Sequence, residues 1–432
     1  MKGQKKTKIS GKNWFLIWFL GFCGQMCWAV ENNTFATYAL TNTGSADVVT
    51  WMVALSALAS TVATFIFGTM GDRLGRRKRI INIGFILWGI FTIAFGLADF
   101  IPKNPIWMLC VYVVFMDSVM SFCGSIGYSG GVNPWTTDIS DETNRGSVSG
   151  ALSAMVIVAN IVVLGLQGVI VEKFGFLTLF VVMGGLVLVM GVLSIFLLED
   201  SADLKPSVTK EKFFAQVMEA FDFKETFRNR ELLLMMLTLC VYTIGFNIYM
   251  SYMTSYLWIY FPVYAGVELS KGSASIIQGV GMLLGVLLSI LGVKPINKGK
   301  TVSVTFISVI VSVISLIAIS FCKSVALMYV LVAMASFGYV LCLLATTAWF
   351  KNLCPEDKCG QTEGVKQIFY NLIPMIVGPI IAGSIIKKID FHTIVDGVSV
   401  NSPTNMLFLV AGIATAFTLI PLWFAHRNHK AE

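Results

Sequence analysis

The sequence is poor in charged residues. Only 13% of its 432 residues are charged, against 56% that are hydrophobic. A soluble domain has about 25% charged residues, so this chain lacks the polar surface that a water-soluble protein of its length needs. Intrinsic disorder is excluded as well, because it requires low hydrophobicity. We therefore expect an integral membrane protein.

Histidine is scarce, and cysteine is not clustered with other metal ligands. The three His residues fall in predicted loops or tails, so no zinc site is expected. The nine Cys residues are an odd number, and most lie in apolar runs, where a thiol behaves as a small hydrophobe. No G-x-x-x-x-G-K-[ST] loop is present, which excludes an ATP-driven pump in a single chain. We expect neither an enzyme nor a bound cofactor.

Twelve apolar runs are long enough to cross a bilayer, which requires about 20 residues each. The runs are 14–38, 49–70, 80–99, 106–130, 149–171, 177–198, 232–260, 273–293, 302–321, 325–349, 366–386 and 405–425. The longest polar stretch, 199–231, divides them six and six. The predicted fold is an all-α membrane protein with twelve transmembrane helices in two six-helix pseudo-repeats.

The predicted organisation follows from these runs. A basic tail at 1–13 precedes an N-terminal bundle at 14–198, and a C-terminal bundle at 232–425 precedes a second tail at 426–432. The linker 199–231 contains an apolar helical face, which predicts an amphipathic helix along the membrane surface. The two halves also echo each other at an offset of 214, as is typical of transporters built from parallel repeats. The matching positions are Glu142, Gly146 and Gly150 with Glu356, Gly360 and Gly364.

Lysine and arginine are distributed unequally between the two sides. With both termini in the cytoplasm, 25 of the 31 basic residues lie on the inner side. The outer six are Lys103, Lys173, Lys271, Lys323, Lys387 and Lys388. This asymmetry predicts cytoplasmic termini, and it explains the net charge of +7 without a nucleic-acid partner. No organelle address is recognisable, so we expect the cell membrane, by default the bacterial inner membrane. We also expect a monomer.

The loop between spans two and three carries a motif. It reads GTMGDRLGRRK from Gly68; the glycines permit a tight turn, and Asp72 can cap a helix or pair with an arginine. The pattern G-x-x-x-D-R-x-G-R-R resembles the signature loop of the major facilitator superfamily, and it stands at that family's position. The resemblance implies alternating access around a central cavity, with this loop as a conformational latch. The gating candidates are Gly68, Asp72, Arg73, Gly75, Arg76 and Arg77.

A narrower resemblance concerns spans four and eleven. The segments MDSVMSFCGS, NPWTTDISDETNRG and GVKQIFYN are similar to the melibiose-permease-like (glycoside–pentoside–hexuronide) cation symporters. In those proteins a span-four acid helps bind the coupling cation and a span-eleven lysine serves coupling, and Asp117 and Lys366 match these positions. The resemblance implies a carbohydrate substrate. Alternatively, Lys366 extends to the cytoplasmic interface from its place near the helix end.

Two carboxylates lie inside predicted spans: Glu31 in span one and Asp117 in span four. An ionisable residue there costs roughly 2.5–3.5 kcal/mol on insertion scales, so a function is favoured. A rise of about 1.5 Å per residue places both acids in the outer half of the membrane, and in the facilitator fold both spans line the cavity. The pair could carry a proton or, with neighbouring oxygen donors, hold Na⁺. The alternative for Glu31 is simple solvation near the outer interface.

Neutral polar and aromatic residues in the spans suit sugar recognition. Amides hydrogen-bond hydroxyl groups, and an aromatic face packs against a sugar ring. The alternative is that such residues join helices, so we expect only a minority to touch substrate. The candidates are Trp28, Asn32, Asn247, Tyr252, Gln278, Gln367 and Asn371, with Asn160 and Gln167 as further members.

The sequence therefore predicts a secondary active transporter that takes up a small sugar or glycoside with H⁺ or Na⁺. Its partners would be that small molecule and the lipid bilayer. One alternative is a proton-driven exporter of amphipathic drugs, which would have a more apolar cavity. Another is a non-transporting membrane sensor on the same scaffold, which would bind without flux.

Overall fold

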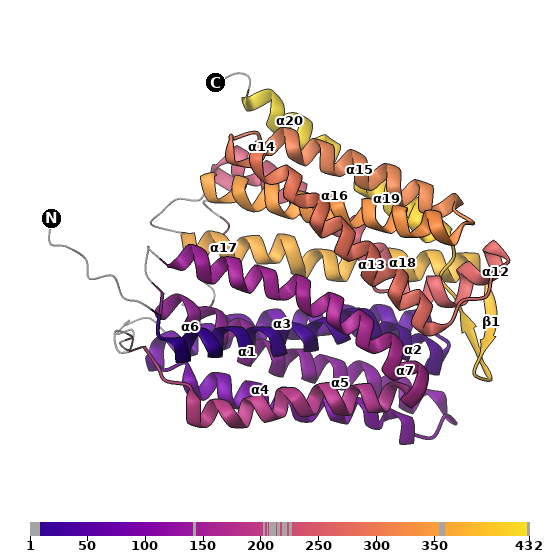
Figure 1. The fold of residues 1–432 in the computed structure, drawn as a ribbon, viewed down its shortest axis with the longest axis horizontal. Coiled ribbons are helices and arrows are strands. Elements are labelled where there is room, and N and C mark those ends of the chain that lie inside the picture. The colour runs from indigo at the N-terminus through magenta and orange to yellow at the C-terminus, as the bar shows by residue number, and fades with distance from the viewer. Residues whose placement is uncertain are drawn as a thin grey trace, which may run out of the picture. The chain divides into compact units, whose positions relative to one another are not determined.

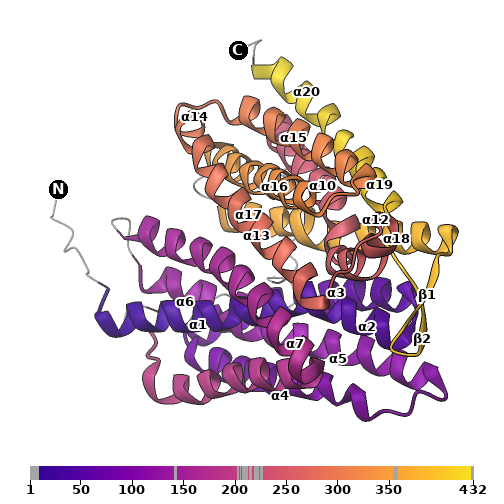
Figure 2. The ribbon, with the colours of Figure 1, turned by 45° about the vertical axis from the view of Figure 1, so that its right-hand side comes forward.

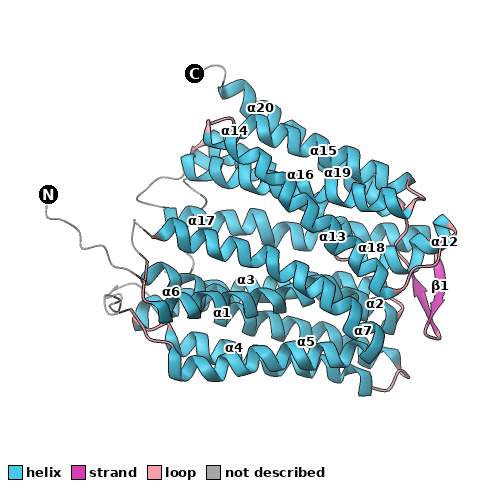
Figure 3. Cartoon of the chain, viewed as in Figure 1, coloured by secondary structure: helices cyan, strands magenta, loops and turns pink. Residues whose placement is uncertain are grey.

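A computed structural model describes residues 9–140, 144–201, 204, 206, 213, 217, 223, 227–353 and 359–429. These residues are mostly helical (Figures 1, 2 and 3). Among them, eleven helical stretches are long and apolar enough to span a membrane. One of them, Gly150–Leu197, has 48 residues and is interrupted at Gly175, whose φ of 81° and ψ of 173° are not helical. A bilayer core takes about 20 helical residues, so this stretch supplies two crossings, and the prediction of twelve spans is confirmed.

The elements before the linker make up the first six crossings. In order they are α1 Gly11–Val30, η1 Glu31–Phe35, α2 Ala36–Thr43, α3 Ala46–Leu74, α4 Lys78–Gly96, η2 Leu97–Phe100, α5 Ile106–Gly127, η3 Tyr128–Val132, α6 Asn133–Asp138 and α7 Arg145–Leu197. The predicted amphipathic helix of the linker, apart from isolated residues, lies outside the described residues, as do Glu142 and Glu356 of the internal repeat.

The elements after the linker are α10 Arg230–Met250, α11 Met253–Ser255, η4 Tyr256–Tyr260, α12 Phe261–Ala265, α13 Lys271–Ser289, η5 Ile290–Gly292, α14 Val293–Asn297, α15 Thr301–Phe321, α16 Val325–Leu353, α17 Cys359–Gln367, η7 Ile368–Leu372, α18 Ile373–Ile389, β1 His392–Val395, β2 Val398–Asn401, α19 Met406–Ala416 and α20 Leu419–His429. A short antiparallel hairpin, β1–β2, thus occupies a connection for which no structure was predicted. Its turn residues Asp396 and Gly397 both have positive φ, as a two-residue hairpin turn requires.

Four of these elements are five-residue π-helical segments: η1, η3, η4 and η7. Three of them end two residues before a proline, namely Pro134, Pro262 and Pro374. Proline removes a backbone donor and clashes with the preceding turn, so a wider turn ahead of it relieves the conflict. Two residues after η1 the chain has Thr37 instead of a proline, so a proline does not explain the wider turn of η1.

The described chain divides into two compact units that share helices. Unit 1 comprises Met1–Glu31, Leu55–Leu166 and Lys173–Val217, and unit 2 comprises Asn32–Ala54, Gln167–Glu172 and Met218–Glu432. The chain passes from one unit to the other inside η1, inside α3 and twice inside α7. The predicted bundles at 14–198 and 232–425 stay a prediction.

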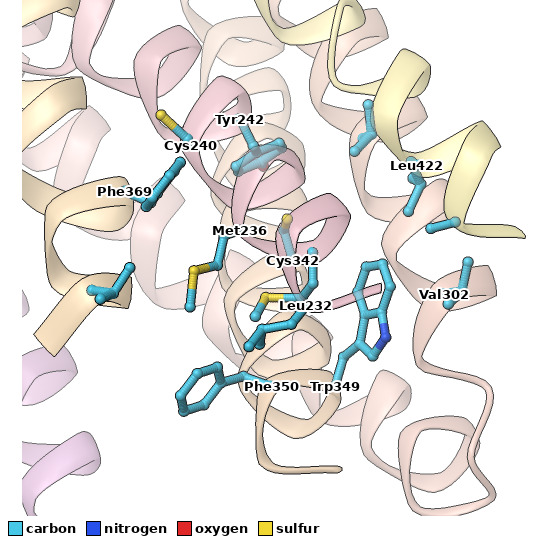
Figure 4. Packing of buried hydrophobic residues seen from close by; sticks show 14 residues of the cluster. Leu232, Met236, Cys240, Tyr242, Val302, Cys342, Trp349, Phe350, Phe369 and Leu422 are labelled. Carbon is cyan, nitrogen blue, oxygen red and sulfur yellow. The ribbon is translucent and has the colours of Figure 1, made fainter. Parts of the chain in front are cut away.

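One buried apolar cluster lies in unit 2 and is drawn in Figure 4. It joins α10, α15, α16 and α20 through residues such as Met236, Val302, Trp349 and Leu422. The indole of Trp349 also donates a hydrogen bond of 3.1 Å to Glu231 at the start of α10.

Close helix approach in unit 1 depends on glycine pairs, as expected where small residues let backbones meet. A Cβ atom added to Gly84 of α4 would collide with the backbone nitrogen of Gly127 in α5. We expect Gly84→Ala to destabilise the protein by about 1–3 kcal/mol, because overpacking forces backbone shifts. Thermal unfolding in detergent measures this effect. Gly185→Ala in α7 is the matched control, since a Cβ there meets nothing within 4 Å; equal losses in the two variants would refute the packing explanation.

Candidate functional site

The two predicted acids lie together in unit 1. Glu31 opens η1 and is 8% exposed, and Asp117 in the middle of α5 is 1% exposed. Ser121, one turn after Asp117, donates a hydrogen bond of 2.6 Å to Glu31 Oε1. Asp117 is hydrogen-bonded to Ser56 of α3, and the two carboxyl groups are near enough to interact electrostatically. Three helices therefore build one acidic site.

One oxygen of each carboxyl group in this site has no partner. Glu31 Oε2 and Asp117 Oδ1 are buried and make no hydrogen bond. A buried polar atom without a partner costs about 1–3 kcal/mol, and native structures contain few of them. Two such oxygens in one acidic site can take up a proton or, together with the hydroxyls of Ser56 and Ser121, coordinate a hard monovalent cation. Within the described residues, no cluster of three or more His, Cys, Asp or Glu could hold a metal ion.

Trp28 and Asn32 lie on either side of Glu31 along the first span. Trp28 is half-buried in α1, and its ring packs against Trp88 of α4 with 5.1 Å between centroids. Asn32 is exposed. The indole of Trp28 is thus partly exposed one turn before Glu31.

A second polar cluster lies in unit 2 and is centred on two buried amides. Gln278 of α13 accepts a hydrogen bond of 2.7 Å from Thr254 and donates one of 3.0 Å to Asn33 in η1. Gln167 of α7 accepts one of 2.6 Å from Thr34 in η1 and donates one of 3.3 Å to Ser275 in α13. Both glutamines are 4% exposed. We call this cluster the amide seam; its members are Asn33, Thr34, Gln167, Thr254, Ser275 and Gln278.

The amide seam has two hydrogen-bonded neighbours in unit 2. The hydroxyls of Ser255 and Thr37 lie 3.0 Å apart, and the Tyr252 hydroxyl donates to the Ala46 carbonyl at 3.2 Å. Two of the predicted substrate ligands, Tyr252 and Gln278, are thus buried and bonded to other parts of the protein. Sequence could not place them there, because the rotation of each helix decides which partner a polar side chain meets.

The remaining unit 2 candidates are more open. Asn247 of α10 is half-buried and donates to Thr243 of its own helix at 2.8 Å. Asn371 in η7 is half-buried, whereas Gln367 is exposed. Lys366 is half-buried, with its ammonium group 4.5 Å from the centre of the Phe350 ring, a cation–π distance. Asn160 of α7 donates to its own helix at 2.8 Å.

Near Asn247 and Asn371 lies an aromatic group that the sequence analysis did not single out. Tyr339 of α16 stacks on Phe246 of α10, with 3.8 Å between ring centroids and 9° between ring planes. The Tyr339 hydroxyl is also hydrogen-bonded to that of Tyr370 in η7. All three rings are half-buried. Aromatic residues are common in spans, so only the packing of three helices shows that these belong together.

Within the signature loop, Arg77 is the residue that the structure buries. Its guanidinium group forms ion pairs with Asp72 and, at 3.0 Å, with Asp138, and it donates to the Gly68 carbonyl at 3.1 Å. The backbone N–H groups of Arg77 and Lys78 donate to Asp200 at 2.7 and 2.8 Å. This network joins the ends of α3, α4, α6 and α7 inside unit 1.

The other loop candidates have lesser roles in this network. Gly75 adopts a φ of 59°, which favours glycine, and Arg76 is exposed. Arg73 lies 5.4 Å from the ring of Phe213. Asp138 and Asp200 were not among the predicted site residues. Asp138 ends α6 and Asp200 lies three residues after α7. Their position after a span, on the side predicted to carry the basic residues, was the available signal.

The comparisons with known proteins agree on one fold. The family model described as Major Facilitator Superfamily matches residues 17–379, and no curated protein sequence is significantly similar. A mutant of the nucleoside transporter NupG superposes with a TM-score of 0.76 at 11% identity, covering 95% of this chain and 99% of that one.

Two other solved structures are similar over comparable lengths. A D-xylose-proton symporter has a TM-score of 0.69 at 13% identity, covering 94% and 97% of the two chains. A bacterial homolog of the human lysosomal transporter Spinster has a TM-score of 0.67 at 15% identity, covering 98% of each chain. At these identities the likeness shows the fold alone.

Proposed function

Because the chain belongs to the Major Facilitator Superfamily, we propose that this multi-pass membrane transporter takes up a small sugar or glycoside together with H⁺ or Na⁺. Its termini would lie in the cytoplasm, as its basic residues predict, and it would act as a monomer. Two similar structures are a nucleoside transporter and a D-xylose-proton symporter. A nucleoside contains a pentose and D-xylose is a pentose, which supports a sugar-like substrate.

The observation that carries this proposal is the pair of carboxyl groups at Glu31 and Asp117, each with one buried oxygen lacking a partner. A buried site that gains or loses one positive charge can use the membrane potential. Moving one charge through about 100 mV supplies roughly 2.3 kcal/mol, equivalent to about fifty-fold accumulation of a solute. Glu31 and Asp117 therefore act as the ion-coupling residues.

Substrate recognition is assigned to half-buried rings and amides. Trp28 offers a ring face beside the acids in unit 1, and Asn247, Asn371 and Tyr339 offer amides and a ring in unit 2. Sugars need this combination, because ring faces pack on C–H groups and amides bind hydroxyls. Lys366 supports coupling from the start of the same span as Asn371.

Counterflow in proteoliposomes tests the proposed substrate class. The panel contains D-xylose, other monosaccharides, disaccharides and nucleosides, with pH and Na⁺ gradients imposed separately. We expect a sugar to exchange and one of the two gradients to drive its accumulation. If nucleosides exchange and no sugar does, the substrates are nucleosides and the proposed sugar class is wrong. Efflux of cationic dyes without sugar exchange would support an exporter instead.

A further inference from the structure

The segment η1 connects the acidic site with the amide seam through five consecutive residues. Its first residue, Glu31, is bonded to Ser121 in unit 1. Its third and fourth residues, Asn33 and Thr34, are bonded to Gln278 and Gln167 in unit 2. The division between the two units also falls inside η1, between Glu31 and Asn32. Any change in the winding of η1 therefore acts on both sets of bonds.

No proline follows η1 at the position where one follows the other three π segments. The other three π segments each precede a proline that forces a wider turn, but Thr37 stands at that place after η1. A π turn contains one residue more than an α turn. Rewinding η1 as an α-helix would rotate the residues on one side of it by about 100° relative to the other side. Asn33 and Thr34 would then leave their partners.

Two other helices change unit close to a residue of one of these clusters. In α3 the chain leaves unit 2 after Ala54, and Ser56, the partner of Asp117, is the second residue of unit 1 there. In α7 the chain enters unit 2 at Gln167, which belongs to the amide seam. Each of these helices therefore carries one member of a cluster next to its unit division.

We propose that η1 is a register coupler, in which the charge on Glu31 decides whether Asn33 and Thr34 keep their bonds to Gln278 and Gln167. This inference rests on the proposed function of Glu31. The uncharged carboxyl group suits its buried place, whereas a charged one is costly there until a cation or water meets its free oxygen. Turning Glu31 toward such a partner rewinds η1 and opens the amide seam. Gln278 and Gln167 are positioning residues that act through η1.

A double-mutant cycle tests this coupling. Ser255→Cys, next to the amide seam and fully buried, reports opening through its rate of maleimide labelling, followed by peptide mass spectrometry at one fixed pH. The buried native Cys342 is the internal reference. The fixed pH is alkaline, so that Glu31 is charged in part of the molecules. Glu31→Gln, which cannot ionise, is then expected to lower the labelling rate about tenfold, within the usual range of coupling between sites. In a Gln278→Met, Gln167→Met background, which removes both bonds to η1, the rate rises, and Glu31→Gln no longer changes it.

Two further variants separate the coupling from a general loosening. Asn33→Ala with Thr34→Ala removes the other ends of the same two bonds and should abolish the Glu31→Gln effect in the same way. Tyr252→Phe removes a neighbouring bond that does not involve η1, so the tenfold effect should persist in it. A tenfold effect that persists in both doubly substituted backgrounds, or no effect of Glu31→Gln in the otherwise unmodified protein, would overturn the register coupler. Gradient-driven accumulation by Glu31→Gln tests the proposed ion-coupling role separately.

Discussion

The Asp117→Asn variant is expected to lose gradient-driven accumulation while it retains counterflow. The amide is close in shape to the acid and can keep a hydrogen bond with Ser56, but it can neither take up a proton nor supply a negative charge. Accumulation that reaches about fifty-fold at 100 mV in the unmodified protein should fall to equilibration. Uptake of labelled solute into proteoliposomes under imposed gradients measures the ratio, and exchange without a gradient measures the retained cycle.

Ser118→Ala is the matched control for this variant. Ser118 is the next residue of α5, and its hydroxyl bonds only to the Val114 carbonyl of its own helix, at 2.8 Å. We expect it to accumulate solute as the unmodified protein does. Accumulation at the unmodified level by Asp117→Asn would remove the acid from the coupling mechanism.

The second large effect is expected for Arg77→Ala. The substitution leaves two carboxylates, Asp72 and Asp138, without their cation. Asp72 is half-exposed and Asp138 is only partly exposed, so water can solvate the carboxylates and the cost stays below that of a fully buried pair. Hydrogen bonds to charged groups contribute about 1.5–3 kcal/mol, so the melting temperature in detergent should fall by a few degrees. The maximal transport rate should fall with little change in KM, because the network lies at the helix ends and contains no predicted substrate-binding residue.

Two variants control the interpretation of Arg77→Ala. Arg76→Ala alters an exposed neighbour of equal charge, and surface substitutions usually change stability by less than about 0.5 kcal/mol. Arg77→Lys keeps the charge but loses the planar guanidinium group that binds several acceptors at once. Its losses of stability and transport rate should therefore lie between those of Arg76→Ala and Arg77→Ala. Equal effects of Arg76→Ala and Arg77→Ala would show that total loop charge matters and that the buried network does not.

The sequence was sufficient for the crossings and the signature loop, because apolar run length and local motifs need no tertiary information. It placed Glu31 and Asp117 inside two different spans, and the structure brings these two acids together. Their depth in the membrane stays a prediction. Their ion-coupling role is untested and remains a prediction. The sequence could not show that Arg77 is buried while Arg76 is exposed, because adjacent arginines differ only in the direction in which the turn points their side chains. The π winding at Glu31–Phe35 was likewise hidden, since no proline marks it.

The partner choice of polar side chains was the hardest feature to predict. Gln278 and Tyr252 carry groups suited to sugar hydroxyls, yet both are buried and bonded within unit 2. In a membrane, a polar side chain either joins helices or faces a polar ligand, and a rotation of one helix decides between these roles. The stacked pair Phe246 and Tyr339 shows the same limit, because two different helices contribute its rings.

The most direct test of the account is whether an ion moves with the solute through the acidic site. Solute is added to proteoliposomes in a weakly buffered medium, and the external pH and the uptake of labelled Na⁺ are recorded together. Ion-coupled transport through Glu31 and Asp117 requires that H⁺ or Na⁺ enters in a fixed ratio to the solute, and that this movement is absent in Asp117→Asn. Solute uptake without movement of either ion, or ion movement that Asp117→Asn leaves unchanged, would contradict it.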